Sequence, residues 1–193
     1  MEGKKFLIPI EIIPRHIHLS EKHWRQLFGL FIEPRILQNL SQREQMVLME
    51  TVKIIGPNKN FLEEVHAVGG WRRQTQVEIS ESEAVCLGLH PPVRLSGHLI
   101  RSPGCKMVGP KGSVIIKQGV IIPVSHLHLG VKDAEKLKLK QNQVLSLGLA
   151  GRRDQWLDNV VVRVHPSFRL ALHITSDVAA KFWLSASDKA FLK

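Results

Sequence analysis

Short runs of β-branched and apolar residues, separated by Gly, Pro or Asn, dominate the hydrophobic pattern of this chain. Runs bounded in this way are typical of short β-strands. The segments that fit are 46–55, 77–79, 93–96, 113–122, 143–149 and 159–164. Many short strands favour a mainly β fold, a barrel or sandwich, over a doubly wound α/β sheet. No expected strand leads into a Gly-x-Gly-x-x-Gly or Walker turn, which argues against a Rossmann or P-loop nucleotide site.

Two segments of the chain echo each other. Residues 12–20 read Ile-Ile-Pro-Arg-His-Ile-His-Leu-Ser, and residues 121–130 read Ile-Ile-Pro-Val-Ser-His-Leu-His-Leu-Gly. Each leads into a stretch with helical spacing, over 21–28 with Ser20 as a suitable N-cap and over 131–139 with a weaker cap. The echo predicts a duplicated unit of strand, His-x-His, short helix and β-rich stretch.

Composition narrows the class of protein. The 193 residues are 44% hydrophobic and 23% charged, which is enough to bury a core and argues against a mainly disordered chain. No apolar run approaches the roughly 20 residues that cross a bilayer, and the N-terminus does not read as a secretory signal. The two cysteines, Cys86 and Cys105, are not in a Cys-x-x-Cys pair, which argues against disulfides and a thiolate zinc knuckle. We therefore expect a cytoplasmic protein without a membrane partner.

The net charge of +10, from 27 basic and 17 acidic residues, indicates an anionic partner. Nucleic acid and a phosphorylated small molecule both fit this charge. The basic residues are scattered, and the chain has no RNP-like aromatic motif and no zinc-finger spacing, so we expect no nucleic acid. A non-catalytic module that binds nucleic acid or a protein shell stays open as an alternative.

The two His-x-His pairs are the first candidate site. Residues at i and i+2 of a strand point to the same face, so His16 and His18 aim two imidazoles in one direction, as do His126 and His128. One such pair is more often a pair of ordinary half-buried or exposed histidines. Two pairs in matching frames of a repeat favour metal ligation, with zinc the metal that imidazole suits. His173 lies in an apolar run, and a buried neutral histidine needs a partner, so it is a candidate third ligand.

A polar segment at 70–80 is the second candidate. Alternation would place four of its side chains on one face of a strand: Arg72, Gln74, Gln76 and Glu78. Taken alone, this is a solvated edge strand. Beside a metal, Glu78 could be a ligand and Arg72 could hold an anion. Ser96 is either a plain strand-end serine or a hydrogen-bonding group of a site.

Together these motifs resemble those of the PduL-type phosphate propanoyltransferase family, the zinc-dependent phosphotransacylases. The resemblance extends over about residues 7–180. The matching segments are 15–20, 50–52, 55–57, 72–80, 92–97, 103–104, 108–114, 126–128, 158–164 and 172–174. It implies two β-barrel domains with short flanking helices, the second barrel inserted in the first. The first domain would comprise 1–18 and 121–193, and the inserted domain 19–120.

The resemblance also implies an activity, the transfer of an acyl group between coenzyme A and inorganic phosphate with two zinc ions. Carried over by position, the zinc ligands are His16, His18 and Glu78 for one ion, and His126, His128 and His173 for the other. Arg72 matches the phosphate-holding arginine, and Ser96 is our candidate contact for coenzyme A. The chemistry agrees, because a metal and a guanidinium can position phosphate and stabilise an oxyanion. We expect direct attack of zinc-bound phosphate on propanoyl- or acetyl-coenzyme A, with no acyl-enzyme.

Four positions depart from the family pattern: Ile13, Ser125, Gly130 and Ala180. None is an expected metal donor, so the departures bear on acyl-chain preference and coenzyme A affinity. Few residues precede the first expected strand, which favours a free cytoplasmic enzyme over the microcompartment lumen and its shell. A homo-oligomer is compatible with the sequence. The competing enzyme is a binuclear zinc hydrolase of phosphoesters or thioesters, which two metals and an arginine would also serve.

Overall fold

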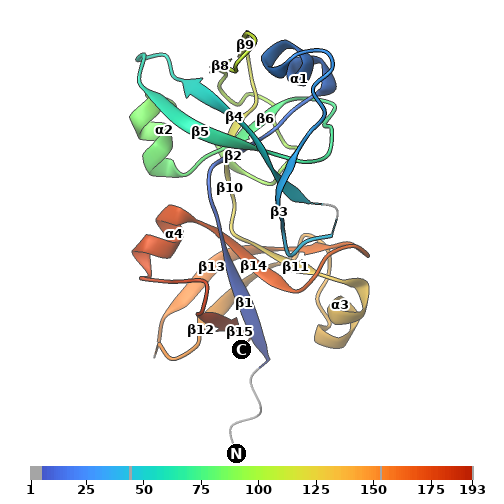
Figure 1. The fold of residues 1–193 in the computed structure, drawn as a ribbon. Helices are drawn as coiled ribbons and strands as arrows, with labels where there is room; N and C mark the ends of the chain where they lie inside the picture. Colours follow the sequence, from blue (N-terminus) through green and yellow to red (C-terminus); the bar gives the residue numbers. More distant parts are fainter. Residues whose placement is uncertain (1–5, 44, 153, 193) are drawn as a thin grey trace, which may run out of the picture. The chain divides into compact units, whose positions relative to one another are not determined.

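The structure is a computed structural model that describes residues 6–192 apart from 44 and 153. Over that part of the chain it is mainly β, with four short helices (Figure 1), as predicted. The chain divides into two compact units. Unit 1 contains the residues up to Ile13 and those from Val124 on, and unit 2 contains Pro14–Pro123. The expected cytoplasmic location of the protein rests partly on residues 1–5, which lie outside the described residues.

Unit 1 is a closed barrel of six strands. In barrel order these are β1 (Leu7–Ile13), β14 (Ala171–Thr175), β11 (His126–Leu129), β13 (Trp156–Val164), β12 (Val144–Leu149) and β15 (Lys189–Phe191). Helices α3 (Val131–Leu137) and α4 (Ser176–Lys181) follow β11 and β14 along the chain. Leu127, Leu147 and Leu172 are fully buried in its core. Because strand residues alternate between faces, Leu127 in the core leaves His126 and His128 to face the other way.

Unit 2 is built on a curled nine-stranded sheet. Its order is β7 (Val93–Arg94), β10 (Val120–Pro123), β6 (Gln76–Glu78), β2 (His16–His18), β5 (Phe61–Val68), β4 (Met46–Ile55), β8 (Cys105–Val108) and β9 (Ser113–Ile116), with β3 (Ile36–Asn39) also paired to β4. The helices are α1 (Glu21–Phe28) and α2 (Glu81–Leu87). Ile17, Leu27 and Met107 are fully buried in the core of this unit.

Several predicted elements are confirmed with their bounds. The strand over 46–55 is β4, and the helix over 21–28 is α1, whose N-cap Ser20 accepts a hydrogen bond from the backbone N–H of His23. The strand predicted over 113–122 is instead two strands, β9 and β10. Gly119, at φ 139°, interrupts it where a Cβ would lie 2.6 Å from the carbonyl oxygen of Thr75.

The repeat seen in the sequence is present in the strand pairing. In unit 2, β2 lies between the parallel β5 and the antiparallel β6, and in unit 1, β11 lies between the parallel β13 and the antiparallel β14. The next strand outward is parallel in both units, β10 beside β6 and β1 beside β14. Strand β1 comes just before β2 in the chain, and β10 comes just before β11. The first repeat therefore has β1 in the sheet of unit 1 and β2 in that of unit 2, whereas the second repeat has β10 in unit 2 and β11 in unit 1.

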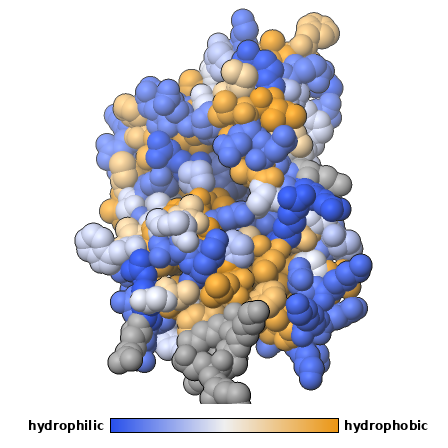
Figure 2. All heavy atoms as spheres, turned by 60° about the horizontal axis from the view of Figure 1, so that its bottom comes forward, coloured by the Kyte–Doolittle hydropathy of each residue, from blue (hydrophilic) through white to orange (hydrophobic). Residues whose placement is uncertain are grey.

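The surface mixes polar and apolar residues. On the face shown in Figure 2, hydrophilic and hydrophobic residues are interspersed. Some large apolar side chains are nearly fully exposed, such as Phe31 at 91% and Trp183 at 86%. Among the described residues, no helix combines the length and apolar character that a membrane span requires.

Candidate metal centres

The first cluster of donors lies in unit 2. His16 and His18 lie on β2 and Glu78 lies on the antiparallel strand β6, where it is the Cα partner of His16. The Nε2 atom of His16 is 3.6 Å from Glu78 Oε2, and that of His18 is 3.9 Å from Glu78 Oε1. All three residues are buried. The structure thus brings together three donors that lie as much as 62 residues apart in sequence.

Hydrogen bonds with neighbouring groups orient the side chains of this cluster. His16 Nδ1 lies 3.0 Å from the carbonyl oxygen of Pro14, which leaves its Nε2 for the cluster. The amide of Gln76 donates to the Glu78 carboxylate and, at 2.9 Å, to Ser96 Oγ, while Gly97 N–H donates to Gln76 Oε1. Ser96 is therefore connected to Glu78 through the side chain of Gln76, a link that no motif in the sequence indicates.

Arg72 lies close to this cluster, but the strand predicted for it was wrong. Only Gln76–Glu78 form β6, and Arg72 and Gln74 precede it in a loop. The loop begins after Gly70, whose φ of 89° suits glycine, and the Arg72 N–H donates to the carbonyl of Leu19 just beyond β2. Arg72 thus remains beside the histidine pair while its side chain is exposed.

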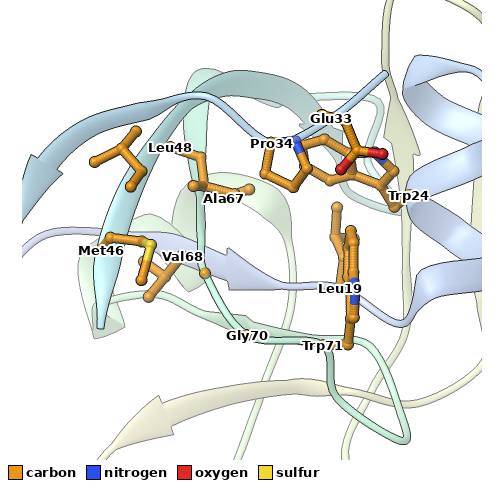
Figure 3. A pocket seen from close by; sticks show the side chains of 12 residues that line it. Leu19, Trp24, Glu33, Pro34, Met46, Leu48, Ala67, Val68, Gly70 and Trp71 are labelled. Atoms are coloured by element: carbon orange, nitrogen blue, oxygen red, sulfur yellow. The ribbon is translucent and has the colours of Figure 1, made fainter. Parts of the chain in front are cut away.

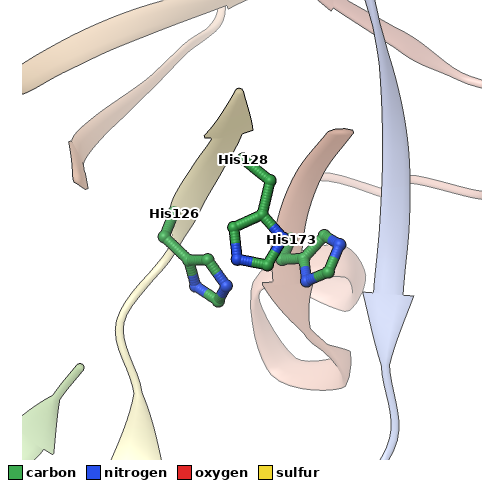
Figure 4. Close-up of side chains that lie close together, drawn as sticks. All are labelled: His126, His128 and His173. Atoms are coloured by element: carbon green, nitrogen blue, oxygen red, sulfur yellow. The ribbon is translucent and has the colours of Figure 1, made fainter. Parts of the chain in front are cut away.

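The second cluster lies in unit 1 and consists of three histidines (Figure 4). His126 and His128 come from β11, and His173 comes from β14 as the Cα partner of His126. The ring centroids are 4.3–5.0 Å apart. Phe168 stacks on His128 with a centroid distance of 3.9 Å. No pattern in the sequence predicts this contact.

The environment of His126, His128 and His18 favours the neutral form of their imidazoles. Burial, and after it the nearby charge of His173, lowers the pKa of His126 to about 3. Burial, followed by the charges of His173 and His126, also lowers the pKa of His128. In unit 2, burial lowers the pKa of His18 well below its ordinary value, with smaller contributions from His16 and Arg72. Neutral imidazole is the form that binds a metal.

The donor sets fit divalent metal ions. In each cluster, one donor atom can be taken from each residue so that all three lie within 4.8 Å of one another. Sets of three histidines, or of two histidines and a glutamate, are typical of zinc sites that keep a position open for substrate. His128 Nδ1 is also buried without a hydrogen-bond partner, an uncompensated cost that a metal or a reorientation of the ring would remove. The residues present therefore fit the two zinc ions expected from the sequence.

A separate cavity of about 290 Å³ lies in unit 2 (Figure 3). Trp24, Trp71, Leu19 and Met46 give it a largely apolar lining, and Glu33 adds one carboxylate. None of the predicted metal donors lines it, and neither Arg72 nor Ser96 does.

Comparison with known proteins gives consistent matches along most of the chain. The family model described as phosphate propanoyltransferase matches residues 9–185. The chain is 38% identical over 185 residues to a phosphate propanoyltransferase from Priestia megaterium, covering 96% of this chain and 85% of that protein. It is 37% identical over 186 residues to one from Thermotoga maritima, covering 96% and 88%, and 36% identical over 172 residues to one from Listeria monocytogenes, covering 89% and 80%. The range matched by the family model includes all six donors of the two clusters.

Proposed function

Since the chain belongs to the phosphate propanoyltransferase family, we propose that it interconverts a short acyl-coenzyme A and inorganic phosphate with an acyl phosphate and coenzyme A. It is an acyltransferase enzyme. The acyl groups we assign are propanoyl, from the names of its relatives, and acetyl. The observation that supports this most directly is the pair of three-donor clusters, one in each unit, within the range that the family model matches.

Two zinc ions are proposed as cofactors. His16, His18 and Glu78 would hold one, and His126, His128 and His173 would hold the other. When bound, such ions supply positive charge that orients phosphate and polarises a carbonyl. The protein's own contribution is to hold the donors together in a largely buried setting, where electrostatic interactions are stronger than in water.

Arg72 is proposed as the phosphate-binding residue. Its guanidinium can form two parallel hydrogen bonds to a phosphate, and it lies close enough to the unit 2 cluster for its charge to lower the pKa of His18. Held there, a phosphate oxygen attacks the thioester carbonyl, a C–O bond forms, and the C–S bond breaks with its electron pair leaving on the coenzyme A thiolate. Because a thiolate leaves readily, the reaction needs no protein nucleophile.

The two cysteines fit a role as spectators. Cys105 is buried, and this burial raises the pKa of its thiol to about 12, so it is not a nucleophile at neutral pH. Cys86 is exposed on α2. Ser96 is proposed to contact coenzyme A, supported by its hydrogen bond to the Gln76 amide that also holds Glu78.

The test is release of free thiol from propanoyl- and acetyl-coenzyme A, with and without added phosphate, together with elemental analysis of the protein. Activity should require phosphate, disappear with a chelator and return with zinc. Since exposed Cys86 would itself react with a thiol reagent, Cys86→Ser protein gives the cleaner baseline. Metal-loaded protein that releases no thiol with either substrate would contradict the proposal, and thioester consumption without phosphate would favour the hydrolase.

A further inference from the structure

Glu11 is a charged residue in an otherwise apolar strand, β1, of sequence Leu-Ile-Pro-Ile-Glu-Ile-Ile. In the parallel pairing of β1 with β14 it is the Cα partner of His173. Its Oε2 atom lies 3.0 Å from His173 Nε2, and its side chain is 29% exposed. The carboxylate therefore lies directly behind one member of the three-histidine cluster.

The two nitrogens of the His173 ring face different surroundings. Figure 4 shows one of them turned toward the rings of His126 and His128, and the other turned away, toward the pale blue strand β1. Because Nε2 is the atom beside Glu11, Nδ1 is the atom that faces the cluster. His173 Nε2 is buried and makes no well-directed hydrogen bond, although Glu11 is within reach of one.

We propose that Glu11 is the positioning residue of the three-histidine site: its carboxylate accepts a hydrogen bond from His173 Nε2–H. The inference rests on the proposed function, because it assumes that this cluster holds a metal. A proton fixed on Nε2 leaves the Nδ1 lone pair free to face His126 and His128. Carboxylates that bind the outer nitrogen of a ligating histidine orient the ring and raise its basicity.

The two units supply their carboxylates differently. In unit 2 the acid, Glu78, belongs to the donor set itself, and the residue beside it on β10 is the apolar Ile121. In unit 1 the corresponding donor is His173, and the acid lies one strand farther out, as Glu11. Three neutral imidazoles would leave the charge of a divalent ion uncompensated in a buried site, and Glu11 supplies that compensation.

The experiment measures metal affinity at this cluster alone. In a His16→Ala, His18→Ala background, which removes the unit 2 donors, the full-length protein is titrated with Co²⁺ in competition with a chelator and followed by visible absorbance. We expect Glu11→Ala to raise the Co²⁺ dissociation constant about 10- to 100-fold and to alter the absorption bands. Glu11→Gln keeps an acceptor oxygen without the charge, so it should give a smaller increase. Glu135→Gln, at an exposed acid on α3 of the same unit, should match the parent.

The outcomes separate this inference from the proposed function. If the Glu11 variants bind Co²⁺ with the parent's affinity and spectrum while His173→Ala does not bind, the positioning role is wrong and the metal site stands. If the parent background binds no Co²⁺ at all, the metal site of the proposed function and this inference fall together. Thermal unfolding of the metal-free variants is the check on folding, and should Glu11→Ala not fold, the isosteric Glu11→Gln decides the question by the same titration.

Discussion

Replacing Glu78 by Gln should affect the metal-free and metal-loaded protein differently. The Glu78 side chain is only 7% exposed, and its carboxylate accepts a hydrogen bond from the Gln76 amide. Glutamine has nearly the same volume and keeps an acceptor oxygen, but it removes a buried charge that costs free energy to desolvate. The metal-free variant should therefore be at least as stable as the wild type, whereas the metal-loaded variant loses one of its three donors.

The size of the effect follows from binding linkage. A site that binds only the folded protein contributes about 2.7 kcal/mol to the free energy of unfolding when free metal is about 100 times its Kd. For a chain of this length, each kcal/mol moves Tm by about 2–4 °C, so each site accounts for a zinc-induced rise of about 5–11 °C. Two sites double that rise in the wild type, and Glu78→Gln should keep about half of it.

The assay is thermal unfolding followed by circular dichroism, with chelator and with zinc, for the wild type, Glu78→Gln and the control Glu135→Gln. The control should show the full zinc-induced rise, since Glu135 is exposed and belongs to neither cluster. A Glu78→Gln protein with the full wild-type rise would show that Glu78 is not a ligand. A variant that is much less stable even without metal would show that the carboxylate stabilises the fold, contrary to the desolvation argument.

Three further predictions concern Arg72 and the cysteines. Arg72→Ala should lower kcat/KM for phosphate by about 10²–10³-fold, while Arg73→Ala, its exposed neighbour, should not; equal losses for both would refute a specific phosphate contact. At pH 8 one thiol of the native protein, Cys86, should react with Ellman's reagent, and Cys105 should react only after unfolding. The Cys105 thiol titrates near 9.0 unfolded and near 12 folded, so the folded state binds the extra proton and stability falls as pH rises between these values. The loss is about 1.4 kcal/mol per pH unit, and it should be missing from the denaturant unfolding of Cys105→Ala; an unchanged pH slope would contradict it.

Local signals in the sequence were sufficient for some elements. Helix α1 combines a Ser20 N-cap with a Gly29 stop at φ 113°, and both signals act within one turn of the helix. Helix α2 was not predicted, although its start has a local signal. Ser80 and Glu83, three residues apart in sequence, form a capping box in the structure. Elements whose ends are fixed by neighbouring residues are therefore the ones that a single sequence reveals.

Contacts between distant strands could not be obtained in this way. The strand predicted to include Arg72 is wrong because β6 extends only as far as it pairs with β2. That limit is set by the register of the two strands and not by local composition. The network from Glu78 through Gln76 to Ser96 likewise depends on how separate segments pack. The histidine pairs were visible because i and i+2 share a face in any strand, whatever it pairs with.

The exchange of first strands explains why the two clusters can differ in chemistry while sharing a frame. Glu11 and Ile121 stand five residues before the first histidine of their respective pairs, yet each lies beside the third donor of the other repeat, Glu11 beside His173 in unit 1 and Ile121 beside Glu78 in unit 2. A change in the first strand of one repeat therefore alters the surroundings of the other repeat's cluster. In each unit exactly one of these two neighbouring positions is acidic, so a divalent ion would meet one carboxylate in either unit. That balance predicts that moving the acid outward in unit 2, by Glu78→His with Ile121→Glu, should restore two zinc ions per chain, whereas Glu78→Ala should bind only the one held in unit 1. A double variant that still binds one zinc ion per chain would show that the two frames are not interchangeable.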